Sequence, residues 1–172
     1  EEPLAVVLTP GPYNETYFEH AYLARHLGVP LVQGQDLTVR ADTLYLKTFA
    51  GLRRVHAILR RLDDDYCDPL ELRSDSSLGV AGLVQVKRAR NLVLANALGS
   101  GFLESSAVQG FLPAIARALL GQELLLPSLP TWWCGEGAAW AAVRNELPGR
   151  VLRPAFGGDG ESIVRTPQVD VE

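Results

Sequence analysis

Short apolar runs alternate with amphipathic segments along the first part of the chain. Four runs are apolar almost throughout, as is typical of strands buried on both faces of a sheet: residues 4–8, 29–32, 55–59 and 92–95. Residues 17–27 and 80–89 instead place apolar side chains at helical spacing. The order strand, helix, strand predicts parallel pairing with right-handed crossovers. We therefore expect an open, three-layer α/β fold with a mostly parallel, Rossmann-like sheet.

Two segments lie outside this alternation. Residues 38–40 and 43–47 alternate between apolar and polar positions around Ala41-Asp42, which predicts a small two-residue β-hairpin at the edge of the sheet or beyond it. Residues 60–77 are polar and irregular, so we expect a long loop there.

The first predicted helix has recognisable start and stop signals. Thr16 and Glu19 have the spacing of a capping box, with Asn14 as an alternative N-cap, and Gly28 is a C-terminal stop. The helix also carries His20, which is six positions from the next histidine and therefore off its face, so we expect both histidines on the surface.

The second part of the chain predicts shorter elements. Capping-box spacing at Ser106 begins a helix that should end at Gly121, and an Ala-rich helix is expected to end at Glu146. A strand follows at residues 150–154. Two neighbouring tryptophans in the Pro-rich connector are expected to pack against other apolar groups.

Composition narrows the class of protein. A chain of 172 residues with 47% hydrophobic residues is long and apolar enough to bury a core. Its net charge is −4, and its charges are scattered, so it has no basic stripe for nucleic acid. No apolar run is long enough to span a bilayer and the start does not look like a signal peptide. We expect a cytoplasmic protein without nucleic-acid or membrane partners.

Two further features concern cysteine and methionine. Cys67 and Cys134 form no CxxC pair and have no clustered histidines around them, so we expect free thiols and no metal site. The sequence contains no methionine and does not begin with one, and we expect it to be a segment of a longer protein.

Candidate chemistry lies in the loops that follow the apolar runs, because open parallel sheets bind ligands at the carboxyl ends of their strands. The first loop presents Thr9, Tyr13 and Asn14 at a helix N-terminus, where backbone amides favour an anion. A stiff turn with an N-cap explains the same residues.

The other two loops offer charged and small polar groups. Arg60 and Arg61 beside Asp64 and its acidic neighbours can hold a carboxylate or phosphate, although a solvated ion-pair cluster explains them equally. The third loop is glycine-rich, which lets its backbone approach a ligand or simply turn tightly, and its candidates are Asn96, Gly99 and Ser100. The predicted substrate-binding residues are Thr9, Tyr13, Asn14, Arg60, Asp64, Asn96, Gly99 and Ser100. The sequence identifies no catalytic residue.

Six short segments form an ordered series of motifs: residues 7–14, 17–20, 59–65, 96–100, 130–134 and 153–156. This series covers nearly the whole chain and resembles the middle of the circularly permuted type 2 ATP-grasp family, which is similar to glutathionylspermidine synthases. It implies a pre-ATP-grasp-like substrate domain at residues 1–130. It also implies a closing helix and strand at 131–172 that lead into an ATP-grasp core elsewhere in the parent protein.

The resemblance further implies ATP-dependent activation of a carboxylate, attack by an amine, and magnesium bound to the phosphates in the parent enzyme. Arg153 stands where many ATP-grasp enzymes use a nucleotide-binding lysine, and Gly157 and Gly158 begin a glycine-rich turn that can approach phosphate. The acidic set that holds magnesium is not identifiable here. We therefore expect neither ATP nor magnesium to bind tightly to this chain alone.

Two functions follow from these observations. The first is a fragment of a carboxylate–amine ligase that contacts a small carboxylate, amine or peptide substrate and partners the remainder of its own chain; alone, the fragment should be inactive. The second is a noncatalytic α/β domain that binds a ligand or another protein, because a fold does not fix a function.

Overall fold

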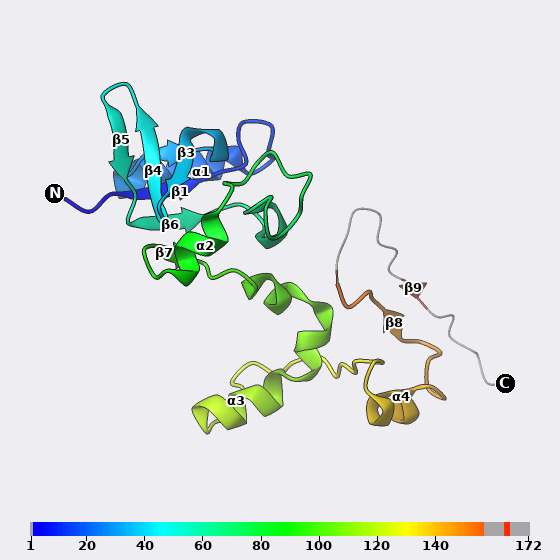
Figure 1. Cartoon of the computed structure of the whole chain (residues 1–172). Helices are drawn as coiled ribbons and strands as arrows, with labels where there is room; N and C mark the ends of the chain where they lie inside the picture. Colours follow the sequence, from blue (N-terminus) through cyan, green and yellow to red (C-terminus); the bar gives the residue numbers. More distant parts are fainter. Residues whose placement is uncertain (1, 157–163, 166–172) are drawn as a thin grey trace. The chain divides into compact units, whose positions relative to one another are not determined.

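The structure is a computed structural model that describes residues 2–156, 164 and 165. The chain divides into two compact units, Glu1–Ser100 and Gly101–Glu172, which we describe separately (Figure 1). The division after Ser100 is a structural one and lies before the domain boundary that the sequence predicts between residues 130 and 131. That domain boundary stays a prediction.

The first unit is built on a parallel sheet of four strands. In spatial order these are β2 Leu31–Val32, β1 Ala5–Leu8, β6 Ala57–Arg60 and β7 Val93–Ala95. Leu8 of β1 pairs with Arg60 of β6, and Leu59 of β6 pairs with Ala95 of β7. The predicted α/β class with a mostly parallel sheet is confirmed. The register also brings three strand ends to one edge.

Apolar strands and helices enclose the core of this unit. Val6, Val7 and Leu8 of β1 are completely buried, as expected for a central parallel strand. Helix α1 Tyr17–Leu27 packs on β1 and β2, and helix α2 Leu83–Arg88 adds two buried apolar residues. Each buried valine or leucine stabilises the unit by about 1.5–3 kcal/mol relative to an exposed one.

The predicted hairpin is part of a larger antiparallel sheet, drawn in cyan in Figure 1. Its strands are β3 Leu37–Arg40, β4 Thr43–Thr48 and β5 Gly51–Arg54. Ala41 and Asp42 have φ of 45° and 55°, so the two-residue turn is confirmed. The third strand was not predicted, because all of its residues are exposed and show no alternation.

Helix ends in the first unit confirm one signal and correct another. Gly28 has a φ of 69° and ends α1 as predicted. The capping box predicted at Thr16 and Glu19 is wrong, because the Thr16 side chain makes no capping hydrogen bond. The remaining short helices of this unit are η1 Gly34–Asp36 and η2 Asp64–Tyr66.

The second unit consists of short elements. They are η3 Ser100–Glu104, which starts at the last residue of the first unit, η4 Ser106–Gly110, α3 Leu112–Leu120, α4 Gly137–Val143 and the antiparallel pair β8 Val151–Leu152 and β9 Val164–Arg165. The predicted cap at Ser106 is wrong by one position, since Ser105 accepts the hydrogen bond from the Ala107 amide. The stop at Gly121 is confirmed by its φ of 64°.

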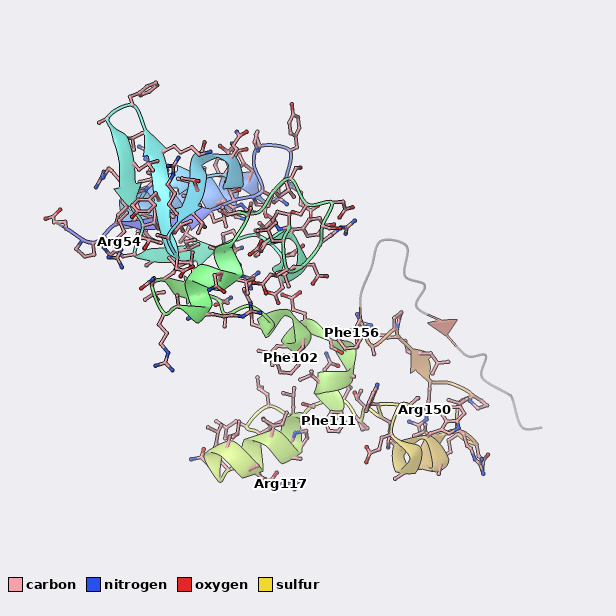
Figure 2. All side chains as sticks on the ribbon, viewed as in Figure 1. Arg54, Phe102, Phe111, Arg117, Arg150 and Phe156 are labelled. Carbon is pink, nitrogen blue, oxygen red and sulfur yellow. The ribbon has the colours of Figure 1, made fainter. Side chains whose placement is uncertain are left out.

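The second unit exposes much of its apolar surface. Among its described residues, Ala116 and Val143 are the apolar side chains in the buried class. Phe111 makes an edge-to-face contact with Trp133 at a ring separation of 6.2 Å. These two rings line a cavity of about 410 Å³ together with Phe102 and Phe156. Figure 2 labels the three phenylalanines of this cavity.

Candidate functional site

Three polar loops meet at the carboxyl edge of the parallel sheet. They follow β1, β6 and β7, whose last residues are aligned by the pairing of Leu8 with Arg60 and of Leu59 with Ala95. The backbone amide of Arg61 also donates to the carbonyl of Leu8 at 2.9 Å, which ties the first two loops together. The expected placement at one edge is therefore observed, whereas substrate binding by these residues stays a prediction.

Arg60 is the link between the second and third loops. Its side chain is only 9% exposed and pairs with Asp64 at 2.5 Å. The guanidinium also donates to the carbonyls of Asn96 at 3.3 Å and Ala97 at 3.2 Å, and to Ser100 Oγ at 3.3 Å. A further hydrogen bond reaches the Leu62 carbonyl. Arg60 thus directs its hydrogen bonds to groups of the protein itself and holds the third loop in place.

Asp64 completes this link from the other side. Its Oδ2 accepts a hydrogen bond from the Gly99 amide at 3.0 Å, while Oδ1 faces Arg60. Gly99 has a φ of 86°, a conformation that favours glycine. The amide of Gly99 is therefore occupied within the loop. Of the groups in this cluster, the Asn96 side chain is exposed at the edge.

Arg61 differs from its neighbour. Its side chain is exposed, and it makes no ion pair with any residue that the structure describes. It also lies close enough to His20 to disfavour a positive charge on that ring. An exposed arginine at the end of a strand is suited to a carboxylate or a phosphate.

The first loop is ordered by a histidine that sequence reasoning placed on the surface. His20 is 2% exposed, and its Nδ1 lies 2.9 Å from the hydroxyl of Thr9, which is 1% exposed. Its Nε2 lies 3.0 Å from the hydroxyl of Thr16. The surface prediction for His20 is wrong because its partners come from the turn before the helix. The other histidine of this helix, His26, is exposed as predicted.

The other residues of the first loop differ in exposure. Tyr13 projects fully into solvent, and Asn14 is half-buried. Asn14 Oδ1 accepts hydrogen bonds from the Thr16 amide at 3.0 Å and the Thr16 hydroxyl at 2.7 Å. Its side-chain orientation is thus fixed by the turn that precedes α1.

Burial shifts two pKa values near this edge. Burial lowers the pKa of His20 below its ordinary value of 6.5, Arg61 lowers it further, and Glu19 opposes the shift. Burial raises the pKa of Cys67 to about 11, and its Sγ lies 3.3 Å from the Asp63 carbonyl. The Cys67 thiol is therefore protonated and unreactive at neutral pH.

Asp68 is a buried acid that the sequence did not reveal. It is completely buried, and its carboxylate accepts the amides of Leu70 at 2.9 Å, Gly82 at 3.1 Å and Val84 at 2.9 Å. These bonds hold the long loop against the start of α2. Asp68 is thus a structural residue, and the only sequence signal for it was its place before a proline.

Comparison with known proteins gives the family. The family model for circularly permuted ATP-grasp type 2 matches residues 1–172. The chain belongs to this family. The family membership agrees with the resemblance found in the sequence, and ATP-grasp proteins typically use ATP and magnesium.

The relatives of this chain are longer proteins. The chain is 42% identical over 167 residues to the uncharacterized protein Rv2411c of Mycobacterium tuberculosis, with 97% of this chain and 30% of the relative covered. It is 46% identical over 159 residues to Rv2567 of the same organism, covering 92% and 18%. It is 40% identical over 165 residues to sll0335 of Synechocystis, covering 96% and 34%. The chain therefore spans about a third or less of these relatives.

The ATP-grasp family directs attention to the predicted nucleotide residues. Arg153 is exposed and lines an open cavity of about 700 Å³ in the second unit. Gly157 and Gly158 lie outside the described residues. Nucleotide binding by these residues stays a prediction.

The family's metal ion has no matching donor set in the described part of the chain. No group of three or more His, Cys, Asp or Glu residues there is arranged to hold a metal ion. Asp64 is already paired with Arg60. We therefore assign no step to magnesium on these residues.

Among the described residues, no helix is both long and apolar enough to cross a membrane.

Proposed function

We propose that this chain forms the substrate-side domain of an ATP-dependent ligase that joins a small carboxylate to an amine. Membership of the circularly permuted ATP-grasp type 2 family supports ATP-dependent ligation. The observation that carries the proposal is the meeting of three polar loops at the carboxyl edge of the sheet, where open α/β sheets bind ligands.

In such a ligase, the γ-phosphoryl group of ATP passes to a carboxylate oxygen and ADP leaves. The amine nitrogen then attacks the carbonyl carbon, phosphate departs with the transferred oxygen, and the nitrogen loses a proton to leave an amide. We assign Asn14, Arg61 and Asn96 to the carboxylate, because their side chains are exposed or half-exposed donors at the edge. Arg60 and Asp64 keep those loops in position.

The remainder of the parent protein is the proposed partner of this chain. We assign the magnesium site and the main nucleotide site to that remainder, with Arg153 as a contribution from this chain. Support comes from the length of the relatives, of which this chain covers 18% to 34%. Localisation in the cytoplasm, where ATP is abundant, is part of the same proposal.

The test uses the full-length parent with ATP, magnesium and a panel of amino acids, dicarboxylates and polyamines. ADP release and amide formation are followed together, the second by mass spectrometry. Asn96→Ala and Arg61→Met should each raise KM for the carboxylate by about tenfold or more, since a charge-assisted hydrogen bond is worth about 1.5–3 kcal/mol. Arg54→Met on the exposed strand β5 is the matched control (Figure 2).

Two results would count against the proposal. Unchanged carboxylate KM in both edge variants would remove the site assignment. Amide formation by the present chain alone would show that the nucleotide and metal sites do not depend on the remainder of the parent.

A noncatalytic binding domain is the second candidate. It is favoured by Arg60 and Asp64, the charged pair of the edge, because each is engaged within the protein rather than presented to a substrate. This function predicts no substrate-dependent ADP release from the parent. It also predicts that calorimetric binding of an amino acid or peptide is independent of ATP.

A further inference from the structure

A buried histidine lies behind the first loop of the proposed site. His20 of α1 is 2% exposed, and each of its ring nitrogens is within hydrogen-bond distance of a threonine hydroxyl. One hydroxyl belongs to Thr9 at the end of β1, and the other to Thr16 just before α1. The proposed function gives this histidine no contact with substrate.

The hydrogen positions around Asn14 follow from the backbone. The amide of Thr16 is a donor only, and it lies 3.0 Å from Asn14 Oδ1. The atom facing it must therefore be the side-chain oxygen, since a flipped amide would bring two donors together. The side-chain nitrogen of Asn14 is left to point elsewhere, and it has no hydrogen-bond partner among the described residues.

The same reasoning fixes the tautomer of His20. The Thr16 hydroxyl has a single hydrogen, which it donates to Asn14 Oδ1 at 2.7 Å. Its oxygen must then accept from the Nε2–H of His20 at 3.0 Å. The opposite tautomer would draw that hydrogen toward His20 and leave two oxygen atoms 2.7 Å apart without a hydrogen between them.

The hydrogen bonds on the Nδ1 side of His20 are consistent with the same tautomer. With Nε2 protonated, a neutral imidazole has an acceptor at Nδ1, which receives the Thr9 hydroxyl at 2.9 Å. The Thr9 oxygen in turn accepts the Gly11 amide at 3.2 Å. One direction of donation therefore runs from Gly11 through Thr9, His20 and Thr16 to Asn14.

We propose that His20 is a positioning residue that, as the neutral Nε2–H tautomer, holds Asn14 with its amide nitrogen as the donor at the carboxyl edge. Asn14 then selects a hydrogen-bond acceptor, such as a carboxylate oxygen, and disfavours a protonated amine, which has only donors. This selection rests on the proposed function, whereas the tautomer and the orientation of Asn14 are properties of the chain itself.

Burial and one of two nearby charged groups favour the neutral form of the His20 ring. Burial lowers the pKa of His20, and Arg61 from the loop after β6 acts in the same direction. Glu19 on α1 acts in the opposite direction. The lowered pKa favours the neutral ring at neutral pH, and the hydrogen bonds to Thr16 and Thr9 select its tautomer.

The test is nuclear magnetic resonance of the isotopically labelled chain, without any ligand. Long-range proton–nitrogen correlations should show His20 protonated at Nε2 and bare at Nδ1. The side-chain amide of Asn14 should give two separate proton signals and a high order parameter. Thr16→Ser should keep these signatures, whereas Thr16→Val should lower the order parameter of the Asn14 amide.

Two substitutions of the histidine form a matched pair. His20→Gln places an amide donor near the position of Nε2 and should preserve the order of Asn14, whereas His20→Asn lacks that reach and should not. Backbone spectra of each variant establish that it is folded. An Nδ1–H tautomer in the native chain, or an ordered Asn14 in a folded Thr16→Val variant, would overturn the proposal. Neither measurement depends on ligase activity, so this outcome is separate from that of the proposed function.

Discussion

Replacing Arg60 tests whether the third loop is held by one side chain. We choose Arg60→Met, which keeps the length of the side chain and removes every donor. The arginine is 9% exposed and its partner Asp64 is 20% exposed, so the pair is largely shielded from water. Loss of one partner of a fully buried pair costs about 3–5 kcal/mol, and partial exposure reduces that cost.

The expected loss of unfolding free energy is about 3 kcal/mol. The hydrogen bonds to Asn96, Ala97 and Ser100 measure 3.2–3.3 Å, which is long, and they add modestly to the ion pair. Arg61→Met is the matched control, because Arg61 is exposed and should lose less than about 0.5 kcal/mol. In a double-mutant cycle, Asp64→Asn should cost less once Arg60 has been replaced.

The assay follows the two units separately. All five tyrosines lie in the first unit and all three tryptophans in the second, so tyrosine fluorescence during denaturant unfolding reports the unit that contains Arg60. Hydrogen exchange should also accelerate at the amide of Gly99, which donates to Asp64. If Arg60→Met is as stable as Arg61→Met and exchange at Gly99 is unchanged, the assigned link between the loops does not exist.

Three further predictions concern burial. Gly79→Ala should destabilise the first unit by several kcal/mol, because the new Cβ would lie 2.1 Å from a backbone oxygen, whereas Gly137→Ala meets nothing within 4 Å; thermal unfolding compares them. A thiol reagent at neutral pH should modify Cys134 in the native chain and reach Cys67 only after unfolding. The lowered pKa of His20 means that its contribution to stability, present above pH 6.5, is lost as pH falls, and His20→Gln should weaken this dependence in unfolding curves.

The strands could be predicted where burial left a continuous apolar pattern. β1 is buried on both faces, so its sequence is apolar at each position and reads as a central strand. β5 was missed because its residues 51–54 are all exposed, and only pairing with β4 makes it a strand. A hydrophobic pattern indicates which side chains are buried, so it gives little information about a strand whose side chains are all exposed.

The candidate site was predictable in its location and not in its hydrogen bonding. Strand order and the polar loops located the edge correctly, since parallel pairing brings strand ends together. The sequence does not show whether Arg60 donates to a ligand or to the carbonyls of another loop, because those partners are 36 and 37 positions away. His20 was missed for the same reason: its burial depends on Thr9, 11 positions earlier, and helical spacing alone cannot reveal that contact.

The side chains that shape the carboxyl edge are held by other protein groups, and this bears on the ligand binding that we propose for the edge. Arg60 orders the third loop and His20 orders Asn14 when the first unit folds. Ordering a side chain on binding costs about 0.5–1.5 kcal/mol, so a residue that is ordered in advance retains more of its interaction energy. Changes at Arg60 or His20 should therefore weaken both stability and ligand affinity. Changes at Arg61 or Asn96 should weaken affinity alone, because their side chains are exposed. Stability and affinity measured on the same variants thus separate the residues that position the site from those that contact the ligand.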